Sequence, residues 1–178
     1  YIAPLVDDAT SSRQSEMQRM LGEAYFRLGL YDSAKLVLDK YAERIGLRAL
    51  SRDDNYLLGV VDYKMQKWES AAKYLERVPT VEDSVTQNAY YHLGDCYLHL
   101  GDDERAQKAL GLASELTYDK IVQEDALFNY AKLLYEHRYN PFSDAVAAFA
   151  RYIELFPNSK RRDEAYTYLG MAFMGTQN

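Results

Sequence analysis

The chain has 178 residues, is 48% hydrophobic and carries a formal net charge of −6 at pH 7. This composition is that of a globular protein with room for one or two compact domains, and its acidic balance argues against nucleic acid as a partner, because phosphate backbones are bound by basic surfaces. The single cysteine forms no internal disulfide, and no apolar run approaches the roughly 20 residues of a membrane-spanning helix, so we expect no membrane insertion by this segment.

The spacing of the apolar residues predicts helices throughout the chain. Segments of about a dozen residues have apolar side chains three and four apart and lack the alternation of strands. Gly29, Gly46 and Pro79 mark helix ends, because glycine readily adopts positive φ and proline cannot continue the hydrogen-bond ladder. Thr80 followed by Asp83 resembles a capping box before the fifth helix. In chain order, the helices are expected over residues 17–28, 31–46, 53–64, 68–78, 82–100, 104–116, 122–137, 141–156 and 161–174.

A large residue followed by a small one recurs in every second expected helix. The small residue stands at positions 22, 59, 94, 131 and 170, so the period is 35 to 39 residues. Such a period indicates stacked helix-pair repeats, each of which contacts mainly its neighbours. We therefore expect one array over residues 1–178, with the end of a preceding repeat and a linker at 1–12, repeats at 13–46, 51–79, 81–116 and 120–157, and the first helix of a fifth repeat at 159–178. Because that last helix lacks a second helix, we interpret the array as a fragment of a longer protein.

Aligned in register, these helix pairs resemble tetratricopeptide repeats, a family that places small residues where two helices cross and large apolar residues around them. The first small position holds Gly22, Gly59, Gly94, Ala131 and Gly170, the second holds Ala34, Ala71, Ala106 and Ala145, and the large position holds Leu38, Leu75, Leu110 and Phe149. Small residues let helix axes approach to about 8–10 Å. One departure is Asp62, which replaces the usual aromatic of the first helix.

The resemblance implies an all-α fold, a right-handed α-solenoid of antiparallel helix pairs whose first helices line the concave side. Within residues 149–170 the sequence is similar to a narrower bacterial cell-envelope subgroup, which includes outer-membrane-assembly lipoproteins and Tol–Pal accessory proteins. That likeness implies a scaffold in the bacterial periplasm.

The resemblance also implies a partner-binding groove along the first helices. Its positions here are Arg19, Glu23, Phe26, Arg27, Tyr56, Tyr63, Lys64, Asn88, Tyr91, Asp95, His99, Phe128, Lys132 and Tyr135. Six are aromatic, and tyrosine in particular offers apolar area with a polar tip, which suits a recognition surface. Two interpretations remain open: the rings bind an extended peptide or a partner helix, or they fill space between neighbouring helices.

Chemical sites are not predicted. His92, Cys96 and His99 lie within one expected helix, but a zinc site needs about four converging ligands, and Cys96 occupies an interior position of the repeat, where a free cysteine behaves as a small hydrophobe. The chain has no phosphate-binding loop and no hydrolase or metalloprotease motif. We therefore predict no enzyme activity, no cofactor and no metal.

The leading functional hypothesis is a non-enzymatic protein–protein interaction scaffold within a bacterial envelope protein, with a protein or peptide partner. The alternative is a structural or oligomerisation module that stacks on further repeats, or on copies of itself, through its open ends.

Overall fold

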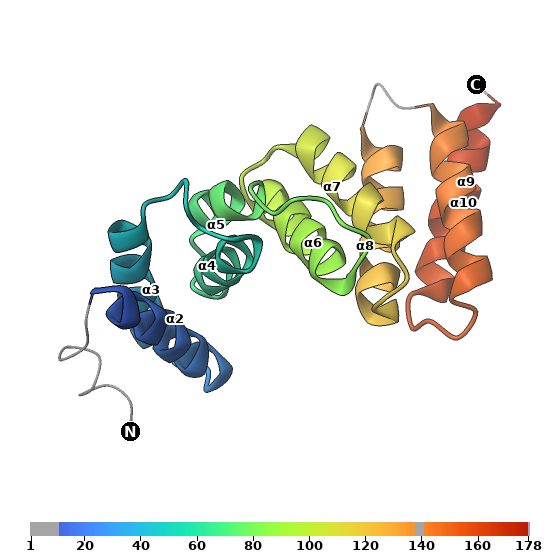
Figure 1. The fold of residues 1–178 in the computed structure, drawn as a ribbon. Helices are drawn as coiled ribbons and strands as arrows, with labels where there is room; N and C mark the ends of the chain where they lie inside the picture. Colours follow the sequence, from blue (N-terminus) through green and yellow to red (C-terminus); the bar gives the residue numbers. More distant parts are fainter. Residues whose placement is uncertain (1–10, 138–140, 178) are drawn as a thin grey trace. The chain divides into compact units, whose positions relative to one another are not determined.

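The computed structural model describes residues 11–137 and 141–177, and within these ranges its regular secondary structure is entirely helical (Figure 1). The helices are α2 (Ser11–Arg27), α3 (Tyr31–Ile45), α4 (Arg52–Lys64), α5 (Trp68–Leu75), α6 (Ser84–His99), α7 (Asp103–Glu115), α8 (Lys120–Glu136), α9 (Phe142–Leu155) and α10 (Arg162–Thr176). The expected all-α class is therefore confirmed. The expected end of a preceding repeat falls mainly on residues 1–10, which lie outside the described residues.

Two helix bounds differ from the expected ones by three residues or more. α2 begins at Ser11, six residues before position 17. Arg13, Gln14 and Glu16 in its first turns favour a helix even without apolar spacing. α5 ends at Leu75, three residues early. There the main-chain N–H of Val78 donates to the carbonyl of Leu75 at 3.1 Å, a tight turn immediately before Pro79, whose ring disfavours a helical predecessor.

The capping residues also differ from the sequence prediction. At the start of α6, the side chain of Asp83 accepts a hydrogen bond from the N–H of Thr86 at 2.8 Å, so Asp83 is the N-cap and the expectation of Thr80 at that position is wrong. The reciprocal capping box lies at α4 instead. Ser51 Oγ accepts from the N–H of Asp54 at 3.1 Å, and the Asp54 carboxylate accepts from the N–H of Ser51 at 2.9 Å. This exchange satisfies two N–H groups that the first turn of a helix leaves unpaired.

The chain divides into two compact units, and each is described by itself. Unit 1 ends at Pro79 and contains α2 to α5, while unit 2 begins at Thr80 and contains α6 to α10. Within each unit, helices adjacent in the chain pack against one another, and in unit 2 α8 also contacts both α6 and α10. The single continuous array and the repeat boundaries stay predictions.

Three of the small residues lie where paired helices cross. A Cβ built on Gly59 of α4 would lie 2.7 Å from Leu75 Cγ of α5, and one built on Gly94 of α6 would lie 2.6 Å from Leu110 Cγ of α7. Gly22 meets Leu38 in the same way. Each leucine therefore occupies the volume that a larger residue in the first helix would need, as the small–large pattern predicted.

Candidate interaction site

A cavity of about 700 Å³ opens on unit 2 beside the first half of α8. We name it the α8 cavity. It is lined by Tyr91 of α6, by Ile121, Val122, Glu124 and Asp125 of α8, and by Asn158, Ser159, Lys160 and Arg161 before α10. Tyr91 and Asp125 reach it because α6 and α8 are successive first helices that contact one another.

Asp125 connects three segments of this cavity. Tyr91 donates its hydroxyl to Asp125 Oδ2 at 2.6 Å, and the Arg161 guanidinium forms an ion pair with Asp125 Oδ1 at 2.7 Å. The guanidinium also lies over the ring of Phe128, 4.9 Å from its centroid. Burial, followed by the hydrogen bond to Asp125, raises the pKa of Tyr91, so the phenol stays protonated and acts as the donor. These contacts hold one wall of the cavity in a defined geometry.

The adjacent carboxylate anchors the loop between α9 and α10. Glu124 Oε1 accepts hydrogen bonds from Ser159 Oγ at 2.5 Å and from Tyr152 OH at 3.1 Å. The sequence analysis included Tyr91 in the groove but none of Glu124, Ser159 and Arg161. Ser159 and Arg161 lie in the loop before α10, and in a loop no helical register predicts the direction of a side chain.

Family models of the tetratricopeptide repeat (TPR) match residues 56–117 and residues 125–159. Together these ranges hold nearly all of α4 to α9. The chain contains tetratricopeptide repeats. The TPR fold is a scaffold for protein–protein interaction, and its repeats are generally not catalytic.

Solved structures with the same fold include a TPR protein and a protein with TPR-like repeats. YrrB, a TPR protein with an unusual peptide-binding site, superposes with a TM-score of 0.74 at 16% identity, covering 99% of this chain and 84% of its own. A MamA protein superposes with a TM-score of 0.67 at 21% identity, covering 92% and 82%. A Podospora anserina kinesin light chain with nearly identical TPR-like repeats gives a TM-score of 0.61 at 14% identity, covering 93% and 87%. At these identities the likeness shows the fold, and it confirms the TPR-like solenoid class. No curated protein sequence matches the chain.

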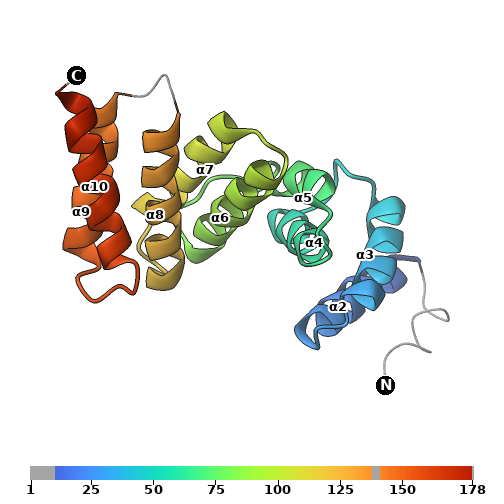
Figure 2. The same cartoon turned by 180° about the vertical axis from the view of Figure 1, so that it is seen from behind.

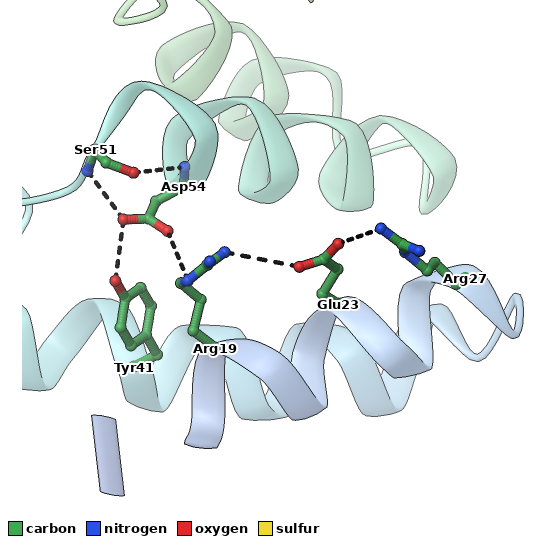
Figure 3. Close-up of polar contacts among 6 residues, drawn as sticks. All are labelled: Arg19, Glu23, Arg27, Tyr41, Ser51 and Asp54. Carbon is green, nitrogen blue, oxygen red and sulfur yellow. Dashed lines mark hydrogen bonds and ion pairs between the residues drawn. The ribbon is translucent and has the colours of Figure 1, made fainter. Parts of the chain in front are cut away.

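In unit 1, the predicted groove positions of α2 carry a row of alternating charges. Along α2, Glu23 pairs with Arg19 at 3.7 Å and with Arg27 at 2.6 Å (Figure 3). Arg19 also reaches Asp54 of α4 at 3.8 Å, and Asp54 accepts a hydrogen bond from Tyr41 OH at 3.0 Å. The row is half-exposed at Arg19 and Glu23 and largely exposed at Arg27, so it presents fixed charges to solvent.

Three predicted groove rings contact the aromatic residue that begins the second helix of the same repeat. The pairs are Phe26–Tyr31 at 5.9 Å, Tyr63–Trp68 at 5.5 Å and Tyr135–Phe142 at 5.8 Å between ring centroids. All three groove rings are partly exposed. They therefore pack against the second helix of their own pair and remain partly exposed, and a role of these rings in binding stays a prediction.

Phe128 differs from the other groove positions. Its side chain is only 3% exposed, and its ring packs edge-on against Phe149, Tyr152 and Tyr168. The expectation that Phe128 lies on an open surface does not hold, because α9 and α10 both cover it. For this residue the packing interpretation is the correct one.

The remaining predicted positions are at least partly exposed on the first helices. The side-chain amide of Asn88 donates to a carbonyl of the preceding turn at 2.9 Å. His99 Nδ1 lies 2.9 Å from the main-chain oxygen of Asp95 and 3.7 Å from its carboxylate. Lys132 pairs with the carboxylate one turn later at 3.8 Å. In unit 1, Tyr56 is half-buried and Lys64 is exposed with its ammonium near the ring of Tyr63.

Cys96 is completely buried in α6, and burial, followed by the charge of Asp95, raises the pKa of its thiol to about 12. A thiol in this state is a poor nucleophile. Over residues 11–137 and 141–177, no three His, Cys, Asp or Glu side chains come together as a metal site would require. Nor does any helix in these ranges have the length and apolar character of a membrane span.

Proposed function

We propose that the chain is a non-enzymatic scaffold that binds an extended peptide of another protein, and that the α8 cavity is its main site in unit 2. The observation that carries this proposal is the cavity itself, which lies between Tyr91, a predicted groove position of α6, and the first half of α8. A volume of about 700 Å³ falls within the range of about 300–1,000 Å³ that ligand pockets occupy. The peptide-binding site of YrrB, which shares the fold, supports a peptide as the class of ligand.

The cavity offers an apolar wall and polar edges. Ile121, which is 81% exposed, and Val122 present aliphatic surface to a peptide side chain. Asn158 and Lys160 also line the cavity and can donate hydrogen bonds to peptide carbonyls. Asp125 is already paired with Tyr91 and Arg161, so the ligand does not have to compensate its charge.

We further propose that other half-exposed groove positions extend this contact surface within each unit. In unit 1 they are Arg19, Glu23, Phe26, Arg27, Tyr56, Tyr63 and Lys64, and in unit 2 they are Asn88, Asp95, His99, Lys132 and Tyr135. The row of charges on α2 would affect the orientation of the bound partner and the choice of partner more than the affinity for it. Exposed charges act mainly on the rate of encounter and on specificity. Phe128 is left out because it is buried.

A bacterial cell-envelope setting is also proposed. It is supported by the likeness of residues 149–170 to the envelope subgroup of the TPR family. Immunoblotting of periplasmic and cytoplasmic fractions from the source organism tests it, and a purely cytoplasmic signal would reject it.

The peptide-binding proposal is tested with peptides selected from a random library on the immobilised chain and measured by fluorescence anisotropy. Ile121→Asp places a charge on the exposed apolar wall and should weaken binding about tenfold without changing the melting temperature. Leu112→Asp is the matched control, because Leu112 is a 47% exposed leucine on the second helix α7. Equal loss of binding in both variants, or none in Ile121→Asp, would contradict a site in the α8 cavity.

A further inference from the structure

A second cavity, of about 320 Å³, opens in unit 1 between the C-terminal half of α3, the loop after it and α5. We name it the α3–α5 cavity. It is lined by Asp39, Ala42 and Glu43 of α3, by Gly46 and Leu47 of the loop, and by Tyr74 of α5. Figure 2 shows this loop beside α5, as Figure 1 does. None of the predicted groove positions on α2 and α4 lines the cavity, so it is separate from the surface proposed above.

The residues that line the cavity include two carboxylates and no cation. The Asp39 carboxylate lies 2.6 Å from Nζ of Lys35, so its charge is already compensated. Glu43 is exposed, and its carboxylate forms no ion pair with any residue that the structure describes. The cavity therefore has one carboxylate whose charge a ligand can compensate.

The C-terminal end of α3 adds partial negative charge at the same place. Gly46 donates its N–H to the carbonyl of Ala42 at 2.8 Å. Over residues 11–137 and 141–177, however, no group donates to the carbonyls of Glu43, Arg44 and Ile45. Unpaired carbonyls at a helix C-terminus carry partial negative charge and favour a cation. A Cβ built on Gly46 would meet no atom within 4 Å, so the backbone is open to a ligand here.

Tyr74 supplies an aromatic wall. Its ring is partly buried against the core of unit 1, and its hydroxyl forms no hydrogen bond within the described part of the chain. The equivalent position of the other second helices, three residues after the small alanine, holds Val37, Ala109 and Ala148. Packing of the repeat therefore does not require a tyrosine at this position. Leu47, which is 49% exposed, adds aliphatic surface from the loop.

We propose that the α3–α5 cavity binds an arginine side chain in a basic segment of another protein. The planar guanidinium has five N–H donors, so it can bond to the Glu43 carboxylate and to the last carbonyls of α3 while its face packs on the ring of Tyr74. Its aliphatic stem, or an apolar neighbour in the segment, packs on Leu47. An ammonium group is a compact point charge and matches this set of acceptors less well.

The charge of the chain argues for a foreign partner over the chain's own residues. A formal net charge of −6 favours the approach of a basic partner and disfavours that of a second copy. Residues 1–10 contain no lysine or arginine, so they do not supply the cation. The volume of about 320 Å³ lies at the lower end of the range of about 300–1,000 Å³ for ligand pockets, which suits a single side chain.

The probe is N-acetylarginine methylamide, titrated into the intact chain at constant ionic strength and followed by proton–nitrogen NMR. It should shift the main-chain amide signals of Gly46, Leu47 and Tyr74 saturably, with a dissociation constant on the order of 1 mM, as expected for so small a ligand. The citrulline compound, which has nearly the same shape and no charge, should cause no such shifts. The lysine compound should bind several-fold more weakly.

Variants of the chain locate the site. Glu43→Gln should weaken binding of the arginine compound about fivefold, because an exposed ion pair is lost, and should leave the melting temperature unchanged. Glu16→Gln is the matched control, because Glu16 is exposed on α2 of the same unit and does not line the cavity. It changes the net charge equally and should leave binding unchanged. Ile121→Asp should also leave binding unchanged, which separates this proposal from the α8 cavity.

Any of four results would overturn the proposal. The arginine compound causes no saturable shifts at the cavity, or the citrulline or lysine compound binds as tightly. Glu43→Gln and Glu16→Gln have equal effects on binding. The original chain self-associates in sedimentation and Glu43→Gln abolishes that association, which would assign the cavity to a second copy.

Discussion

Lys35 of α3 and Asp62 of α4 form an ion pair in which Nζ lies 3.0 Å from Oδ1. The Asp62 side chain is completely buried, and Lys35 is 16% exposed. Ser70 of α5 donates a further hydrogen bond to the other oxygen of Asp62. Asp62 stands where the repeat ordinarily has an aromatic residue, and the carboxylate is accommodated because a cation and a hydroxyl converge on it from two other helices.

Replacing only Lys35 by an uncharged residue should therefore destabilise the fold. Lys35→Met leaves Asp62 as a buried, uncompensated charge and should lower the free energy of unfolding by on the order of 3 kcal/mol. Combining it with Asp62→Leu, which copies Leu134 at the equivalent position of α8, should recover most of that loss. Urea denaturation of both single variants and the double variant measures the coupling. Additive effects would show that the pair is not energetically coupled.

A second prediction concerns alkaline pH. Burial, followed by the hydrogen bond to Asp54, raises the pKa of Tyr41 to about 12, above the value of about 10 in an unfolded chain. Because the folded-state pKa is raised, this contribution to stability is complete below about pH 10 and is lost as pH rises toward 12. The difference in unfolding free energy between the original chain and Tyr41→Phe should shrink by on the order of 2 kcal/mol over that interval. A difference that does not change with pH would contradict the assignment.

The glycines of α4 and α10 should respond oppositely to the same substitution. Gly59→Ala places a Cβ 2.7 Å from Leu75 Cγ and 3.3 Å from its backbone nitrogen, so it should destabilise the chain by about 1–3 kcal/mol. Gly170→Ala meets nothing within 4 Å and should stabilise it by about 0.5–1 kcal/mol, because alanine has the higher helix propensity. Thermal unfolding, monitored by circular dichroism, shows whether Gly59→Ala lowers and Gly170→Ala raises the stability.

Arg161 should matter more for binding than for stability. Arg161→Met removes its contacts with Asp125 and Phe128, but the Arg161 side chain is 44% exposed, so the stability loss should be at most about 1 kcal/mol. Binding of a peptide selected on the α8 cavity should fall several-fold, because Asp125, which orients one wall of the cavity, loses its ion pair with Arg161. Arg151→Met, which removes a comparably exposed ion pair with Glu115, is the control and should leave binding unchanged.

The candidate site was only partly predictable. Tyr91 followed from its register on a first helix, because helical periodicity states which way such a side chain points. Arg161 and Ser159 precede α10, and their position depends on how that loop folds against α8. The burial of Phe128 was missed for a related reason, since helical register does not reveal that α9 and α10 together enclose its ring.

The sequence by itself determined the helices, their pairing and the crossing points, because these depend on local periodicity and on whether a residue has the volume to separate two axes. Gly59 opposite Leu75 is such a case: the small and the large residue can be recognised before any coordinate is known. Only the tertiary structure decided that a lysine and a serine from two other helices compensate Asp62, and that Tyr91, Asp125 and Arg161 meet at one cavity. Those contacts join residues up to 36 positions apart in the chain, and their geometry depends on ångström-scale packing that no residue pattern specifies.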